Sequence, residues 1–257
     1  MSAVLSEGAG TLVTTGCDAD GIRVITARGV LDTATYLPLR DTIIEAALDG
    51  ACAVIVDVTE LVVPAPSAWA VFTSARWHIG EWPDVPMALV CADRHRRLEI
   101  ARNGITRYVA VYEATTKAAA ALSSLRSGAH RRRVRTELTH ALASIATSRQ
   151  FVGNWLTAWY RTDLIPVAKL IVTALVENAL THTTGAPGLR IECKDDLVTI
   201  AVEDASGDPA VRRELSTKGA DGVSGLAIVA AMSRAWGNSP TLSGKTVWAT
   251  IGPENRL

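Results

Sequence analysis

The sequence predicts two domains of different fold class, an α/β domain followed by an α+β domain. The chain has 257 residues, whereas an ordinary domain has roughly 100–200. Strand and helix patterns alternate along the first half, which indicates a mixed or largely parallel sheet with crossover helices. The second half begins with long helices and continues with hairpin strands, a pattern typical of helices on one face of an antiparallel sheet.

The first half carries the alternating pattern of the α/β domain. Residues 21–29 alternate apolar and polar side chains, which predicts a half-buried strand. The unbroken apolar run at 52–58 (CAVIVDV) predicts a central strand covered on both faces. The same reasoning predicts further strands at 86–91 and 108–112, and helices at 35–48, 67–79, 94–102 and 115–125.

The second half contains its helical patterns early. Asp163 is placed to cap the second helix, Pro166 suits its first turn, and the pair Asp195-Asp196 marks a hairpin turn. The predicted elements are, in order, helices at 147–159 and 165–183, a hairpin of strands at 189–194 and 197–204, a helix at 222–235 and a strand at 246–251.

The composition changes most sharply at residues 123–135 (SSLRSGAHRRRVR), where small polar residues lead into three arginines. Such stretches bury little apolar surface and make natural linkers. We therefore predict domains at 1–125 and 134–257, joined by a linker at 126–133. Residues 1–128 hold 11 basic and 14 acidic side chains, and the remainder hold 15 and 12. The two halves therefore carry weakly opposite charges that could attract each other, as an intramolecular contact between the domains would require.

Composition argues against several classes of function. Lysine plus arginine and aspartate plus glutamate both number 26, so nothing in the overall charge favours binding to nucleic acid or to membranes. The cysteines Cys17, Cys52, Cys91 and Cys193 lack the close pairs of a zinc ribbon or a thioredoxin-like site, and mostly buried, reduced thiols are expected. The N-terminus lacks signal-peptide features, and the apolar runs are shorter than the ~20 residues of a membrane span. We expect a soluble, cytoplasmic protein.

Three segments of the second half carry residues suited to a nucleotide. Asn178 lies in an apolar helix, four residues before His182, and its amide oxygen is a hard ligand suited to Mg²⁺. Asp204 lies where a strand ends, and its carboxylate can accept a hydrogen bond from an exocyclic amine such as that of adenine. The glycine-rich run 219–226 leads into a helix, where backbone N–H groups can approach phosphate. Each segment also has an ordinary interpretation, as a surface asparagine, a turn aspartate or a flexible loop. The P-loop pattern is absent.

Together these segments resemble the nucleotide-binding domain of the GHKL superfamily, and within it the anti-sigma factor serine kinases. Residues 174–182 resemble the N box, VEDASGD the G1 box and GADGVSGLAIV the G2 box, and the resemblance covers about residues 130–257. It implies a GHKL (Bergerat) α/β sandwich that binds ATP and Mg²⁺ beneath a mobile lid at 208–221. The residues implied in binding are Asn178 for Mg²⁺, Asp204 for adenine, Gly207 for the first nucleotide loop, Gly222 and Gly225 for the phosphates, and Thr246 for the adenine pocket.

One departure from the kinase pattern concerns catalysis. In that family a glutamate four residues before the asparagine acts as general base, and here that position is Ala174. Glu177 lies about 100° round the helix from Asn178 and does not replace it. Loss of a general base typically costs a factor of ~10²–10⁴ in rate. The first nucleotide loop also lacks its second glycine, because Pro209 follows Asp208. We therefore predict nucleotide binding more firmly than phosphoryl transfer.

The first half resembles a STAS domain, the fold of the anti-sigma factor antagonists, over about residues 10–125. The resemblance rests on the order of strands and helices and on Asp57-Val-Thr-Glu-Leu61, which runs into a helix start. It implies that Ser67 is the phosphoacceptor, although its neighbours Ala65, Pro66 and Ala68 replace the aspartate, serine and glycine of the family motif. The alternative is that Ser67 caps a helix that buries Trp69.

The two resemblances imply a partner-switching regulator of transcription, in which an antagonist-like STAS domain is fused to an ATP-binding anti-sigma-factor-like domain with weak or no kinase activity. The implied partners are a sigma factor and antagonist or anti-sigma proteins. The alternative is an active Mg-ATP-dependent serine protein kinase that phosphorylates Ser67 or another antagonist. A sensor histidine-kinase fragment is disfavoured because His140 lies in a strand-like stretch rather than in a helical dimerisation module.

Overall fold

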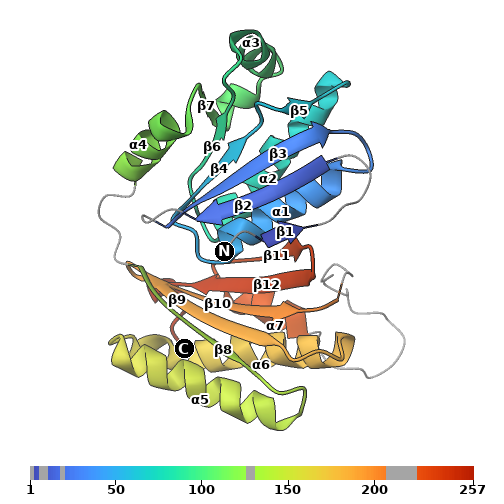
Figure 1. Ribbon diagram of the computed structural model, residues 1–257. Coiled ribbons are helices and arrows are strands. Elements are labelled where there is room, and N and C mark those ends of the chain that lie inside the picture. The colour runs from blue at the N-terminus through green and yellow to red at the C-terminus, as the bar shows by residue number, and fades with distance from the viewer. Residues whose placement is uncertain (1–2, 6–10, 18–20, 126–130, 207–224) are drawn as a thin grey trace. The chain divides into compact units, whose positions relative to one another are not determined.

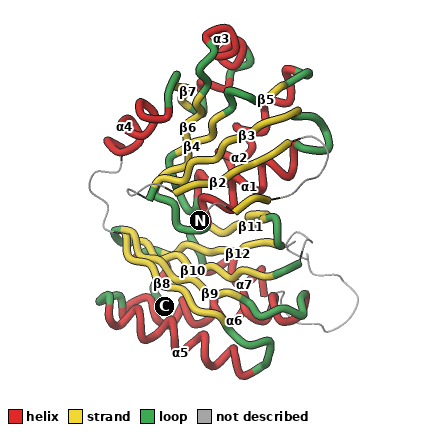
Figure 2. Tube along the Cα trace, in the orientation of Figure 1, coloured by secondary structure: helices red, strands yellow, loops and turns green. Residues whose placement is uncertain are grey.

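The computed structural model describes all residues except 1–2, 6–10, 18–20, 126–130 and 207–224 (Figure 1). The chain divides into two compact units, Met1–Gly128 and Ala129–Leu257. Both units combine helices with a sheet, as the tube in Figure 2 shows by colour. Each unit is described by itself.

The described part of the first unit forms a seven-stranded mixed sheet. Its strands run in the order β1-β2-β3-β4-β6-β7, and β5 pairs with β3. The pairs β1–β2 and β2–β3 are antiparallel, whereas β3–β4, β4–β6 and β6–β7 are parallel. The bounds are β1 Ala3–Leu5, β2 Thr11–Cys17, β3 Ile22–Val30, β4 Ala53–Asp57, β5 Leu61–Val62, β6 Met87–Val90 and β7 Ala110–Tyr112.

Helices cover both faces of this sheet. On one face Ala118 and Leu122 of α4 pack against Ile55 of β4. On the other, α1 packs against β3 and β4 and against α2. The predicted double burial of the central strand is confirmed, because the first four residues of β4 are buried. The helices are α1 Tyr36–Leu48, η1 Pro66–Trp69, α2 Ala70–Glu81, α3 Arg94–Arg102, η2 Ile105–Arg107 and α4 Thr115–Leu125.

The second unit places a helical layer on one face of an antiparallel sheet (Figure 1). The strand order is β11-β12-β10-β9-β8, and every neighbouring pair is antiparallel. The core forms between α6 and the alternate residues of β9, β10 and β12 that point toward it. The bounds are β8 Arg131–Glu137, α5 Ala143–Ala158, η3 Thr162–Leu164, α6 Ile165–His182, β9 Gly188–Lys194, β10 Leu197–Asp204, α7 Gly225–Met232, β11 Ala235–Thr241, β12 Gly244–Ile251 and η4 Pro253–Asn255.

The predicted linker at 126–133 is wrong over its last three residues. Arg131, Arg132 and Arg133 open strand β8, and residues 126–130 lie outside the described part of the chain. The strand forms despite its charge because β8 pairs with β9, where Glu192 accepts hydrogen bonds from Arg131 and Arg133. The acidic residue opposite these arginines therefore allows them to form part of the sheet.

Helix α6 belongs to a segment that departs from the expectation that no apolar run is long enough to span a membrane. The segment Thr162–His182 is long and apolar enough to do so by length and composition, and half of that window is buried within the structure. Its buried residues include Ile171, Val172 and Leu175, which belong to the core of the unit. Packing against the sheet therefore accounts for its apolar face.

Two local predictions about the helices of the second unit are also corrected, one at a helix start and one at a helix end. Asp163 does not cap α6, whose N-cap is Leu164; instead Asp163 lies in the 3₁₀ turn before it and forms ion pairs with Arg161 and Arg256. The helix predicted at 222–235 is observed from Gly225 to Met232. Its last predicted residue, Ala235, instead begins edge strand β11.

Candidate functional site

The register of β10 and β12 in the second unit places their polar residues on two different faces of the sheet. Val202 of β10 lies opposite Val247 of β12, and both belong to the core beneath α6. Side chains two residues apart share a face of a strand. Asp204 and its cross-strand partner Lys245 therefore lie on this helix-facing side, at the end of β10.

Asp204 and Lys245 form a buried ion pair on that side. Lys245 Nζ lies 3.1 Å from Asp204 Oδ1, and the two side chains are 5% and 1% exposed. The backbone N–H of Ser206 donates to the same oxygen over 2.8 Å. Asp204 Oδ2 is buried and, among the residues that the structure describes, it has no hydrogen-bond partner. A buried carboxylate oxygen of this kind calls for an additional donor.

Gly244 allows β12 to begin beside Asp204. Its φ is +156°, and a Cβ at this position would lie 2.0 Å from the backbone oxygen of Asp204 and 2.7 Å from Cα of Ala205. No side chain fits at that distance. The close approach of the two strands fixes Lys245, the next residue, opposite the carboxylate.

Helices α6 and α7 meet close to Asn178. A Cβ on Gly225, the first residue of α7, would lie 3.5 Å from both Cβ and the carbonyl oxygen of Ala174. Asn178 lies one turn further along α6 and is half-buried, whereas its neighbour Glu177 is exposed. Ala174 is 4% exposed, so the position where the resemblance would place a general base is occupied by helix packing.

Thr246, which the resemblance implies in the adenine pocket, lies on the opposite face of the sheet from Asp204. Thr246 lies opposite Glu203 and Ser239, and successive residues of a strand point to opposite sides. Thr246 is fully buried, but on the side away from α6. Lys245 occupies the helix-facing position instead. Of the remaining predicted residues, Gly207, Gly222 and the lid at 208–221 lie outside the described residues.

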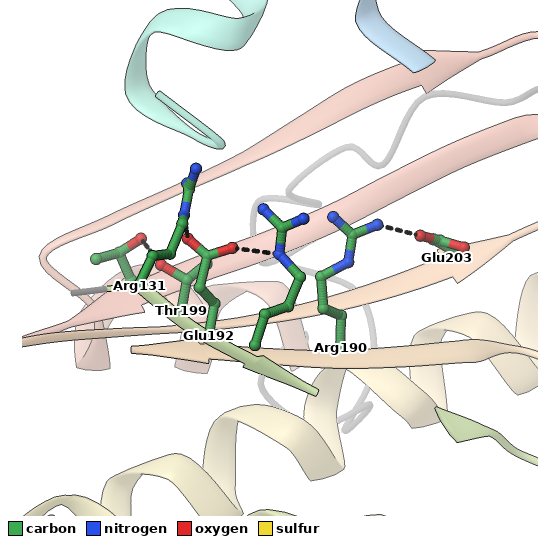
Figure 3. Close-up of polar contacts among 7 residues, drawn as sticks. Arg131, Arg190, Glu192, Thr199 and Glu203 are labelled. Atoms are coloured by element: carbon green, nitrogen blue, oxygen red, sulfur yellow. Dashed lines mark hydrogen bonds and ion pairs between the residues drawn. The ribbon is translucent and has the colours of Figure 1, made fainter. Parts of the chain in front are cut away.

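The opposite side of this sheet carries a network of arginine and glutamate, shown in Figure 3. Glu192 accepts from Arg131 and Arg133, and Glu203 accepts from Arg190 over 2.7 Å. Burial lowers the pKa of Arg190, and the carboxylate of Glu203 opposes that shift. Next to the network, the hydroxyls of Thr199 and Thr250 are 2.8 Å apart. These contacts satisfy charged groups on the side of the sheet that none of this unit's described helices covers.

Ser67 in the first unit is exposed and does not cap a helix. The 3₁₀ turn η1 has Ala65 at its N-cap position, so Ser67 is the second residue of the turn. The capping interpretation is therefore wrong. Trp69, two residues later, is buried as expected, and its indole N–H donates to Glu99 over 3.1 Å. Trp82 is also buried, whereas Trp77 is 79% exposed.

A cavity of about 450 Å³ adjoins Ser67. Its walls are largely apolar and include Tyr36, Leu37 and Pro64. Asp32, at its rim, accepts hydrogen bonds from the backbone N–H groups of Thr35 and Ala34, and these bonds lower the pKa of its carboxyl. An exposed hydroxyl thus lies at the edge of a small apolar hollow.

No protein-family model matches the chain, and no curated protein matches it. Solved structures similar to it include two anti-sigma factor antagonists, each matched over less than half of this chain. An anti-sigma factor antagonist from Mycobacterium paratuberculosis is 18% identical, with a TM-score of 0.40, over 46% of this chain and 99% of that one. RsbS from Moorella thermoacetica is 16% identical, with a TM-score of 0.37, over 44% and 96%. The anti-sigma factor antagonist SpoIIAA in its unphosphorylated form is 17% identical, with a TM-score of 0.36, over 44% and 96%.

Within the described residues there is no cluster of three or more histidine, cysteine, aspartate or glutamate side chains that could hold a metal ion.

Lys245 is the residue of the site that sequence reasoning missed. A lysine directly before a threonine in a strand looks like a solvent-exposed charge. Only the register with β10 shows that it points toward the helices and reaches Asp204.

Proposed function

We propose that the second unit binds an adenine nucleotide with Mg²⁺ on the helix-facing side of its sheet, between the end of β10, α6 and the start of α7. The first unit is antagonist-like in this proposal, and the chain acts as a partner-switching regulator of transcription. The partners are a sigma factor and antagonist or anti-sigma proteins, as the sequence resemblance implies.

The unsatisfied oxygen of Asp204 carries the nucleotide proposal. A buried polar atom without a partner costs roughly 1–3 kcal/mol, so a site that retains one is suited to a ligand that supplies the missing donor. The exocyclic amine of adenine is such a donor. The carboxylate lies at a strand end, on the same side of the sheet as the helix that carries Asn178.

Asn178 and the start of α7 are suited to the metal ion and the phosphates of the nucleotide. The amide oxygen of Asn178 would hold Mg²⁺, which favours oxygen ligands and leaves room for phosphate oxygens and water. The first N–H groups of α7, which begins at Gly225 beside Ala174, are suited to phosphate. These residues bind and orient the nucleotide, and none of them removes a proton from an attacking hydroxyl.

The exposed Ser67 is the feature of the first unit that fits an antagonist-like role. It follows strand β4 and the Asp57 turn, in which the carboxylate accepts from the N–H of Thr59 over 2.9 Å. The cavity beside Ser67 offers a partner both an apolar contact and access to the hydroxyl. A partner could therefore distinguish free serine from phosphoserine at this place.

The second candidate function is that of an active serine kinase, and the exposed hydroxyl of Ser67 favours it. Against it stands Ala174, which is buried against Gly225 where the kinases carry their general base. We therefore propose a nucleotide-binding regulator with weak or no phosphoryl transfer.

Calorimetry with ATP and Mg²⁺ tests the binding proposal. We expect ATP to bind the wild-type protein and to bind Asp204→Asn at least tenfold more weakly, since the amide no longer offers an ionised oxygen. Glu203→Gln is the matched control, because it removes an ion-paired carboxylate from the adjacent residue on the other face. Equal ATP affinity in wild type and Asp204→Asn would reject the adenine contact.

Incubation with labelled ATP separates the two candidate functions. We expect no label, or label far below one phosphate per chain, because Ala174 leaves the site without a general base. Stoichiometric label that disappears in Ser67→Ala would instead establish the kinase function.

A further inference from the structure

Resting on the nucleotide site proposed above, we infer that Lys245 is a specificity-determining residue that donates a hydrogen bond to a ring nitrogen of adenine. Asp204 and Lys245 together form an acceptor–donor pair that recognises the 6-amino edge of the purine. Lys245 was not among the residues that the sequence resemblance implied.

The surroundings of Lys245 explain why it needs a role. It is 4% exposed, and the next helix-facing residue of its strand, Val247, belongs to the core. Placing an ammonium in such surroundings is unfavourable unless it is paired and hydrogen-bonded. Lys245 is paired with Asp204, and a hydrophobic side chain in its place would leave that buried carboxylate without a cation. The buried pair therefore presents a donor and an acceptor together to a ligand that binds beside it.

The hydrogen bonds of the pair are incomplete. Asp204 Oδ1 is used twice, by Lys245 Nζ and by the N–H of Ser206, whereas Oδ2 has no partner among the described residues. An ammonium carries three donors, and the bond to Asp204 uses one of them. The pair therefore offers a ligand one free acceptor next to a cationic donor.

The 6-amino edge of adenine matches this pair. Its amine donates, and each ring nitrogen beside it, N1 or N7, accepts. With the amine on Oδ2, the neighbouring ammonium reaches one of these nitrogens. Hypoxanthine carries an oxygen at C6 and an N–H at N1, so in the orientation that adenine adopts it would place two acceptors against each other at Oδ2. It matches the pair only after a shift of the ring that brings its N1–H to Oδ2 and its oxygen to the ammonium. The test of the role of Lys245 therefore compares adenine nucleotides that differ in a single ring nitrogen.

Nucleotide analogues test the contact on the unmodified protein. ATP, 1-deaza-ATP and 7-deaza-ATP are titrated into the full-length wild-type chain with Mg²⁺ by calorimetry. We expect one of the two deaza analogues, the one that lacks the nitrogen facing Lys245, to bind roughly tenfold or more weakly than ATP, because a charge-assisted hydrogen bond is lost.

Variants assign the effect to the lysine. In Asp204→Asn/Lys245→Met, which removes both charges of the pair and keeps similar volumes, we expect ATP and that deaza analogue to bind with equal affinity. Glu203→Gln, on the opposite face of the sheet, is expected to keep the wild-type difference. Thermal unfolding of each variant shows that it is folded at the temperature of the titration.

The outcomes separate the two proposals. If ATP does not bind the wild-type chain, both the proposed function and the role of Lys245 fail. If ATP binds but both deaza analogues bind as tightly, the nucleotide site stands and the role of Lys245 is overturned. It is equally overturned if the deaza effect persists in the double variant.

Discussion

At the scale of single residues, the site depends on which side of a strand a residue faces. Lys245 and Thr246 are adjacent in the sequence, yet the structure places the lysine beside Asp204 and the threonine on the opposite face. Sequence motifs assign a role to a position, and strand register decides whether that position reaches the site. A one-residue difference therefore separates a residue that pairs with Asp204 from a residue on the opposite face of the sheet.

We predict that Lys245→Met lowers the free energy of unfolding of the second unit by about 3–5 kcal/mol, because it leaves the buried carboxylate of Asp204 without its cation. Adding Asp204→Asn should recover most of this loss, since no unpaired charge remains. Arg234→Met removes an exposed pair with Glu254 and should change stability by less than about 1 kcal/mol. Urea unfolding measures all three. A double variant as unstable as Lys245→Met would contradict the explanation.

Gly244→Ala should destabilise the second unit by well over 1 kcal/mol, because its Cβ would overlap the backbone oxygen of Asp204. The same substitution at Gly185 is the control, because its Cβ would lie 3.6 Å from Cβ of Ala205, an ordinary contact. Thermal unfolding monitored by circular dichroism compares the two. The prediction fails if both variants unfold at the same temperature.

At the scale of elements, the sequence predicted most helices and the central strands. Helices α3 and α4 begin and end where the pattern placed them, since each has clear flanking signals. The β9–β10 hairpin was found from its alternation and from the Asp195-Asp196 turn, where Asp195 has a φ of +52°.

The strands that the sequence did not predict are β1, β2 and β5 of the first unit and the two edge strands of the second unit, β8 and β11. Strands β8 and β11 carry polar or small residues, and their partners β9 and β12 supply the contacts that hold them. Gly237 of β11 illustrates this, because a Cβ there would lie 2.6 Å from Cζ2 of Trp248. A strand that is held by contacts with a partner strand far away in the sequence carries no periodic hydrophobic signal of its own. Within the candidate site, local pattern was sufficient to place Asp204 at the end of its strand.

The edge position of β8 leads to a prediction about its stability. Glu192→Gln should weaken the attachment of β8, because Arg131 and Arg133 would lose their shared carboxylate, at a cost of about 1–3 kcal/mol. Hydrogen exchange of the β8 amides should accelerate more than exchange in β10. Glu137→Gln, at the exposed far end of the strand, should leave exchange in β8 almost unchanged. Uniform acceleration across the sheet would argue against a local role for Glu192.

At the scale of the whole molecule, each unit contains one buried thiol that can report on it. Cys91 is buried in the first unit and Cys193 in the second, whereas Cys17 and Cys52 are exposed. This corrects the expectation that the thiols are mostly buried. Burial raises the pKa of both Cys91 and Cys193. The reactive thiolate is therefore scarce at those two positions in the folded chain.

We predict that a thiol reagent at pH 8 modifies two cysteines rapidly in the native protein and all four after unfolding. Modification of Cys193 then requires opening of the second unit, and ATP with Mg²⁺ should slow it by a factor of about 1 + [ATP]/Kd, because the nucleotide binds only the folded form. Mass spectrometry of timed samples follows each cysteine separately, and Asp204→Asn serves as the variant in which ATP should protect Cys193 less. Rapid modification of Cys193 in the native chain would contradict its burial, and an unchanged rate at saturating ATP would contradict binding to this unit.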